Sequence, residues 1–179
     1  YIANPSNPSG ALAGKDCLLD VISRAGKNRM LVVIDEAFAD FTGVSVIPEA
    51  VKAGNVIVLR SMTKFYAMAG LRLGYAVGAS KLMARLSAFI PAWSVNTLAS
   101  AAGVAALKDR AFRKRTLEWF ESEKEFLFKG LESIDGLEPF ESSANYIMVK
   151  LKGGVDARAL RKCLLEKDGM LIRELSAFP

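Results

Sequence analysis

The 179-residue chain contains no histidine. Histidine is the usual general base in enzymes, the usual partner of a nucleophilic serine or cysteine, and a frequent zinc ligand. Its absence excludes histidine-based nucleophile pairs and most zinc sites. Any catalysis must therefore rely on lysine, aspartate, glutamate, tyrosine, serine, threonine or a cofactor.

Cysteine and long apolar runs are also scarce. Cys17 and Cys163 lie far apart in no CxxC pattern, which is typical of a reducing compartment and argues against disulfide bonds. No apolar run approaches the roughly 20 residues that a transmembrane helix needs. We therefore predict a cytoplasmic protein with no membrane partner, and the sequence contains no metal-binding signature.

Apolar residues make up 51% of the chain, and the formal net charge is +5. This apolar content predicts a sizeable core. The excess positive charge could serve nucleic acid, an anionic membrane or a phosphorylated small molecule. The densest basic segment, residues 108–115, lacks the interleaved aromatics of a nucleic-acid surface. We interpret it as a solvated helix face and predict no nucleic-acid partner.

Three apolar runs predict strands, at residues 30–38, 55–61 and 71–79. Continuous apolarity is typical of parallel strands that are covered on both faces. The third run follows the second too closely for the dozen or so residues of a parallel crossover. The sequence therefore predicts a mostly parallel sheet with one reversed strand.

Helical spacing of apolar residues predicts a first helix after Gly10 that ends near Gly26. Four more segments read as helices: residues 80–89, 95–109, 111–131 and 155–169. Ser80 is the expected cap of the first, and Asp156 and Gly169 lie near the start and at the end of the last. The second has small and apolar residues on every face and is expected to be buried. The region 137–151 predicts two short strands, and residues 170–175 predict a last one. We expect a three-layer α/β sheet followed by a small α+β lobe, with a boundary near residue 109.

The short apolar lead at the start of the chain predicts one more strand, which runs into the turn-rich loop at residues 4–10. Ligands bind at the carboxyl ends of strands in open α/β sheets, and polar residues follow three of the predicted strands at this end: residues 4–10, Asp35 with Glu36, and residues 61–64. Asp35 ends an apolar run, so its carboxylate should be partly buried and should need a cation or strong donors. Loop amides could satisfy it, which is the commoner case. Among functional partners, a protonated ring nitrogen is favoured over a metal because no histidine is available.

Ser61 ends the predicted strand 55–61, Lys64 follows it, and Arg72 lies near the start of the predicted strand 71–79. Lys64 could be an ordinary exposed lysine, but here it is also placed to form a Schiff base with a carbonyl carbon. Ser61 and Arg72 could cap a turn and form a surface ion pair, or could hold a phosphate together. Taken with Asp35, these side chains predict a site for pyridoxal 5'-phosphate.

The motifs together resemble the fold-type I aminotransferase superfamily over essentially the whole chain. "NPSNPSG" resembles that family's Asn-Pro-Thr-Gly loop, which implies that Asn7 donates to the ring hydroxyl of the cofactor. "DEAF" resembles its Asp-x-Ala-Tyr strand end, which implies that Asp35 pairs with the pyridinium. "SMTK" with "GLRLGY" resembles the Schiff-base segment, which assigns Lys64 to the aldehyde and Ser61 and Arg72 to the phosphate. The resemblance implies that residues 1–108 are part of the cofactor-binding large domain, and that residues 109–179 form a bridging helix and a small C-terminal domain.

Within the superfamily, the chain is similar to the histidinol-phosphate aminotransferases and, more closely, to the L-threonine-O-3-phosphate decarboxylases of cobalamin biosynthesis. Phe38 stands where the aminotransferases usually have a tyrosine, and "TKFYAMAGLRLGY" resembles the decarboxylases' lysine segment. Arg173 matches an arginine that reaches the substrate phosphate. The resemblance implies a phosphorylated small-molecule substrate and decarboxylation; transamination, or a non-catalytic remnant that binds a phosphorylated ligand, are the alternatives.

Several parts of the family's site have no counterpart in this sequence. The glycine-rich phosphate loop and the ring-stacking aromatic precede the position of Tyr1, and the arginine for the substrate carboxylate follows the position of Pro179. We therefore expect the second half of a longer protein that forms a homodimer when full length. The 179 residues alone should bind the cofactor weakly and be inactive.

Overall fold

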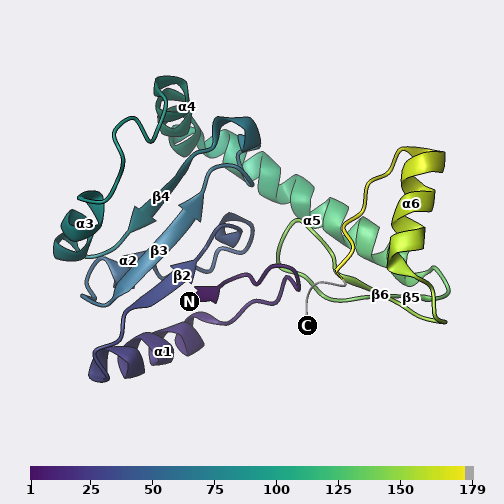
Figure 1. Ribbon diagram of the computed structural model, residues 1–179, viewed down its shortest axis with the longest axis horizontal. Helices are drawn as coiled ribbons and strands as arrows, with labels where there is room; N and C mark the ends of the chain where they lie inside the picture. Colours follow the sequence, from purple (N-terminus) through teal and green to yellow (C-terminus); the bar gives the residue numbers. More distant parts are fainter. Residues whose placement is uncertain (176–179) are drawn as a thin grey trace.

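The computed structural model describes residues 1–175. Its main sheet contains β1 (Ile2–Ala3), β2 (Val32–Asp35), β3 (Val56–Ser61) and β4 (Gly74–Val77), in that order. β1, β2 and β3 are parallel, and β4 pairs with β3 in the antiparallel direction. This confirms the mixed α/β class and the reversed strand (Figure 1). The strands are shorter than the predicted runs. Met30 and Leu31, predicted as part of the strand 30–38, lie before β2 and are exposed.

The core of the sheet region lies against α1 (Lys15–Lys27) and the short α2 (Ile47–Ala50). Leu18 and Ile22, four residues apart on one face of α1, pack with Ile34 of β2 and with Val56 and Val58 of β3. Burying each such side chain contributes roughly 1.5 to 3 kcal/mol. This core holds the parallel strands in register, so their carboxyl ends meet at one edge.

Two helices follow β4: α3 (Ser80–Ser87) and α4 (Thr97–Lys108). Ser80 is the first helical residue, and the cap position belongs to Ala79, without a side-chain hydrogen bond. The prediction that the second of these helices is buried is wrong for the described residues. Only Ala99 and Gly103 of α4 are buried, because nothing within residues 1–175 covers its remaining face.

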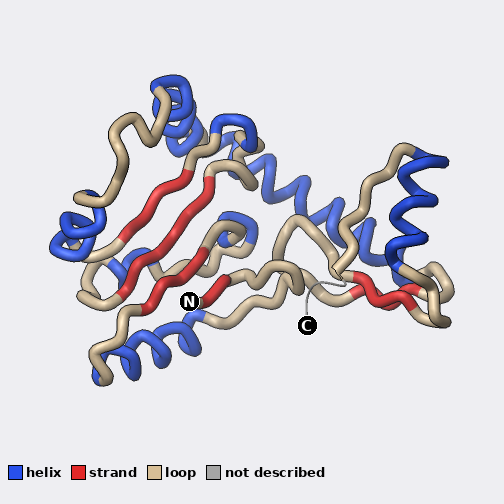
Figure 2. Tube along the Cα trace, in the orientation of Figure 1, coloured by secondary structure: helices blue, strands red, loops and turns tan. Residues whose placement is uncertain are grey.

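The long helix α5 (Arg110–Glu132) connects the main sheet to a second, two-stranded sheet, as Figure 2 shows. β5 (Leu137–Pro139) and β6 (Val149–Leu151) are antiparallel, and α6 (Ala157–Asp168) follows them. Asp156 caps α6 by accepting from two backbone amides, and Gly169 ends it at φ +65°. No helix within residues 1–175 combines the length and apolarity needed to cross a membrane.

The strand predicted over residues 170–175 is wrong: this segment has no regular secondary structure. A strand needs a neighbour for its backbone hydrogen bonds. β5 and β6 pair with each other, and no strand of the described chain pairs with this segment.

Candidate active site

The candidate site lies at the edge where β1, β2 and β3 end. Ala3, Asp35 and Leu59 are direct partners across these parallel strands, so the residues that follow them leave the sheet side by side. Ser61 pairs with Gly74 of the antiparallel β4. A Cβ at Gly74 would lie 2.8 Å from the carbonyl oxygen of Arg60, so the close approach of these strands requires glycine.

Asp35 is partly buried at the end of β2. Its Oδ1 accepts a hydrogen bond from the Ala37 amide at 3.0 Å, so the loop-amide interpretation holds for one oxygen. Its Oδ2 accepts from the Tyr1 hydroxyl. That hydrogen bond, together with burial and the charge of Asp35, raises the pKa of Tyr1 to about 12. Both carboxylate oxygens therefore accept a hydrogen bond within the chain, and Oδ2 accepts it from the side chain of an exposed residue.

Lys64 is exposed after β3, and its amine has two neighbours. Nζ donates to Thr63 Oγ1 at 3.1 Å and lies 5.8 Å from the centre of the Phe38 ring. Thr63 Oγ1 in turn lies 2.7 Å from Ser61 Oγ. The structure thus places an amine beside a pair of hydroxyl groups, an arrangement that suits an aldehyde and a phosphate on one small molecule.

Arg72 lies at the far end of the loop that follows β3. The Met62 amide donates to the Leu73 carbonyl at 3.0 Å, so this loop closes on itself. Arg72 is exposed, has a left-handed backbone at φ +55°, and donates from Nη1 to the Ala69 carbonyl at 2.9 Å. This bond uses one of five N–H donors, so the guanidinium retains donors for an anion.

Asn7 is exposed in the loop after β1, and its side chain has no hydrogen-bond partner within residues 1–175. The other asparagine of the motif, Asn4, is buried. Its Oδ1 accepts from the Ala13 amide at 2.7 Å, and its Nδ2 donates to the Ala13 carbonyl at 3.2 Å. Asn4 therefore shapes the loop, while the side chain of Asn7 is available for a ligand.

The structure does not join Arg173 to this cluster. Arg173 lies on the segment that returns from α6, and it lines a pocket of about 420 Å³ together with Arg161 and three other residues of the same segment. None of the residues at the edge of the main sheet lines this pocket. The assignment of Arg173 to the substrate phosphate therefore stays a prediction.

Sequence reasoning missed Tyr146, which lies between β5 and β6. Its hydroxyl donates to the Ser6 carbonyl at 2.8 Å, and its ring meets the Phe38 ring edge-on at 5.0 Å between centres. Burial raises the pKa of Tyr146 to about 12. An aromatic residue beside a predicted strand reads as ordinary core, so no sequence signal could have identified this contact across 140 positions.

A buried charge network supports the site from behind. Glu36, fully buried, accepts from Arg60 at 2.9 Å and from Ser45 at 2.6 Å. Asp40 contacts Arg60 at 2.5 Å and Arg113 of α5 at 2.7 Å. Burial by itself lowers the pKa of Arg60, but Asp40 and Glu36 contribute to a net rise above its ordinary value. The guanidinium therefore stays charged between two carboxylates.

Residues 1–179, the whole chain, match the family described as aminotransferase class I and II. The chain belongs to this family. Aminotransferases of class I and II are pyridoxal 5'-phosphate enzymes, and the donor set of the candidate site suits that cofactor. Asp35 offers an anion for a ring nitrogen, Lys64 an amine for an aldehyde, and Ser61 with Arg72 donors for a phosphate.

Solved structures of the family resemble this chain closely. A histidinol-phosphate aminotransferase from Clostridium acetobutylicum is 31% identical with a TM-score of 0.91, over 99% of this chain and 54% of that one. An L-threonine-O-3-phosphate decarboxylase from Porphyromonas gingivalis is 29% identical with a TM-score of 0.85, over 98% and 54%. A histidinol-phosphate aminotransferase from Sinorhizobium meliloti, solved in complex with pyridoxal-5'-phosphate, is 26% identical with a TM-score of 0.83, over 96% and 47%.

This aminotransferase-family chain spans about half the length of the curated relatives it matches, 49% and 48% for two of them. Those two relatives are 34% and 31% identical to it. The match runs the length of this chain, so about half of each of these relatives has no counterpart in it.

Proposed function

We propose that the protein containing this chain is a pyridoxal 5'-phosphate enzyme that acts on a phosphorylated amino acid or amino alcohol. The observation that carries the proposal is the gathering of Asp35, Ser61, Lys64 and Arg72 at the carboxyl edge of adjacent strands. A module that only bound a phosphorylated ligand would need no amine beside the hydroxyl pair and no carboxylate facing a donor. This argues against the non-catalytic alternative.

Each side chain has a separate task in this proposal. The cofactor, when bound, supplies an electron sink for the bonds at the substrate α-carbon. Asp35 holds a negative charge at the ring nitrogen, and the Asn7 amide donates to the ring hydroxyl. Ser61 and Arg72 would hold the phosphate, and the Lys64 amine would hold the aldehyde end of the cofactor. The same amine would be placed to move a proton at the substrate.

We propose L-threonine-O-3-phosphate as substrate and decarboxylation as the reaction, which would place the enzyme in cobalamin biosynthesis. The supporting residue is Phe38, which is 8% exposed and lies under the Lys64 amine without the hydroxyl that aminotransferases carry there. The similarity to the Porphyromonas decarboxylase also supports this reaction. Transamination of histidinol phosphate is the second candidate, and the higher TM-score of the Clostridium aminotransferase favours it.

The same proposal assigns Arg173 to the substrate phosphate, since Arg161 beside it would add a second positive charge. It also divides the chain near residue 109, into part of a cofactor-binding large domain and a small C-terminal domain. We further propose that the full-length protein is a cytoplasmic homodimer, and that residues 1–179 alone are inactive.

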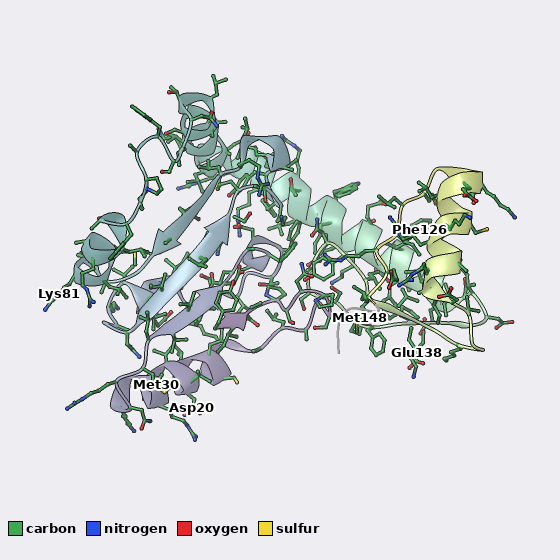
Figure 3. All side chains as sticks on the ribbon, viewed as in Figure 1. Asp20, Met30, Lys81, Phe126, Glu138 and Met148 are labelled. Carbon is green, nitrogen blue, oxygen red and sulfur yellow. The ribbon has the colours of Figure 1, made fainter. Side chains whose placement is uncertain are left out.

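The test uses the full-length protein, including any residues that precede or follow this chain. Borohydride should fix pyridoxal phosphate covalently to Lys64, and L-threonine-O-3-phosphate should release carbon dioxide. Lys64→Ala should abolish both signals. The control is Lys81→Ala, which removes an exposed lysine of α3 and should leave both unchanged (Figure 3).

Two outcomes would contradict parts of the proposal. Turnover of histidinol phosphate that depends on 2-oxoglutarate, without carbon dioxide release, would replace decarboxylation by transamination. Equal labelling of the wild type and Lys64→Ala would remove Lys64 from its role.

A further inference from the structure

The Ser6 carbonyl is a junction in the loop that carries Asn7. It accepts from the Gly10 amide at 2.7 Å and from the Tyr146 hydroxyl at 2.8 Å, and the Ser6 amide donates to the Ala11 carbonyl at 2.8 Å. This carbonyl belongs to the peptide group that joins Ser6 to Asn7. The two hydrogen bonds that it accepts therefore fix the orientation of the peptide plane that precedes Asn7.

The ring of Tyr146 contacts the other side of the site. It meets Phe38 edge-on, with 5.0 Å between ring centres and 85° between ring planes. The same Phe38 ring lies 5.8 Å from Lys64 Nζ. The Tyr146 hydroxyl thus contacts Ser6, the residue before Asn7. Its ring contacts Phe38, which lies beside the Lys64 amine.

The segment that carries Tyr146 is itself held tightly against the Asn7 loop. The Ser143 amide donates to the Gly10 carbonyl at 2.9 Å. Gly10 has φ +74°, and a Cβ there would lie 2.0 Å from Ser142 Oγ. A displacement of residues 142–146 would therefore be transmitted to the loop instead of being absorbed by empty space.

We propose that Tyr146 is a positioning residue that sets the placement of Asn7 and Lys64 toward the cofactor. Tyr146 thereby couples the docking of the C-terminal part of the chain to cofactor binding. The effect of Tyr146 on cofactor binding rests on the proposed function. Its effect on the order of residues 6–11 does not depend on any cofactor.

The hydroxyl and the ring can be tested separately. Tyr146→Phe keeps the edge-on contact with Phe38 and removes only the hydrogen bond to Ser6. A matched control is Ser133→Ala at the far end of α5, which also removes a hydroxyl-to-carbonyl hydrogen bond of 2.8 Å, from Ser133 to Gly130. A neutral hydrogen bond contributes about 1 kcal/mol, which corresponds to a roughly five-fold change in an equilibrium.

Both variants are made in the full-length protein. In Tyr146→Phe, we expect the dissociation constant of pyridoxal phosphate to rise about five-fold, and the pH midpoint of the visible absorbance of bound cofactor to shift. In the cofactor-free protein, hydrogen exchange at the Gly10 amide should accelerate about five-fold. Ser133→Ala should change none of the three.

The possible failures differ from one another. Wild-type affinity, absorbance midpoint and Gly10 exchange in Tyr146→Phe would overturn the inference, and equal losses in Ser133→Ala would reduce it to general destabilisation. If the wild type binds no pyridoxal phosphate, the proposed function fails. Hydrogen exchange at Gly10 then still tests whether Tyr146 orders residues 6–11: acceleration supports this role, and an unchanged rate overturns it.

Discussion

The Asp35 carboxylate opposes ionisation of the phenol beside it. A phenolate next to a carboxylate is disfavoured, and the hydrogen bond from Tyr1 to Asp35 exists only while the phenol keeps its proton. These effects and partial burial raise the pKa of Tyr1 from 10.0 to about 12. Tyr146 reaches about the same pKa through burial alone, without a charged partner. The two tyrosines therefore respond differently to a change at Asp35.

Replacing Asp35 by asparagine should lower the pKa of Tyr1 toward its ordinary value and leave that of Tyr146 near 12. The phenolate absorbance of the cofactor-free protein measures this, with Tyr1→Phe and Tyr146→Phe used to assign each titration. A raised folded pKa stabilises the fold below pH 10, and this stabilisation is lost as the pH rises through about 12. The unfolding free energy should thus fall less steeply in this range in Asp35→Asn. An unchanged Tyr1 titration would refute the contact.

At the residue scale, the sequence singled out positions at strand ends that lie at one edge of the folded sheet, while their chemical roles stay predictions. Asp35 and Lys64 stand out because an ionisable group next to an apolar run needs a partner for its charge. Tyr146 has no such signal, because its importance comes from a contact with Ser6 that only the folded chain creates. Arg173 could be matched to a family position, but its placement depends on a segment that forms no strand.

Among the elements, α5 and the main sheet are connected through a buried arginine. The side chain of Arg60 is 8% exposed between Glu36 and Asp40, whereas that of Arg113 on α5 is 40% exposed. Removing one member of a buried ion network leaves the others charged and unpaired, which costs about 3 to 5 kcal/mol. An exposed ion pair contributes only about 0 to 1 kcal/mol.

Arg60→Met should therefore lower the unfolding free energy by about 3 to 5 kcal/mol, because Glu36 and Asp40 lose their buried cation. Arg113→Met should lower it by at most about 1 kcal/mol. Urea unfolding of the full-length protein, followed by circular dichroism, measures both values. Equal losses in the two variants would show that the network is not organised around Arg60.

The order and type of most elements followed from local pattern. Turn residues, helical spacing and the short gap before Gly74 predicted the helices and the reversed strand, since these features act within a few residues. The strand expected over residues 170–175 and the burial expected for α4 failed because both need a neighbouring element. A pattern states that a segment can be buried or paired, but not that a partner is present.

On the scale of the whole molecule, apolar side chains lie open on the segment that joins α3 to α4. Phe89 is 83% exposed and Trp93 is 98% exposed, and Leu98 at the start of α4 is 75% exposed. Large apolar groups gathered in this way mark interaction surfaces. We propose that a second copy of the full-length protein covers them, in the homodimer proposed above.

Trp93→Ser combined with Phe89→Ser should raise the dissociation constant of this dimer by roughly 700-fold or more, because two buried aromatic side chains at an interface contribute about 2 kcal/mol or more each, about 4 kcal/mol together. Sedimentation equilibrium of the full-length protein measures the constant. The control is Trp119→Ser with Phe126→Ser, two exposed aromatics of α5. Figure 3 shows that Phe126 lies away from the segment between α3 and α4. An unchanged dimer together with a lower unfolding free energy would show instead that another part of the same chain covers the surface. A monomeric wild type would refute the homodimer itself.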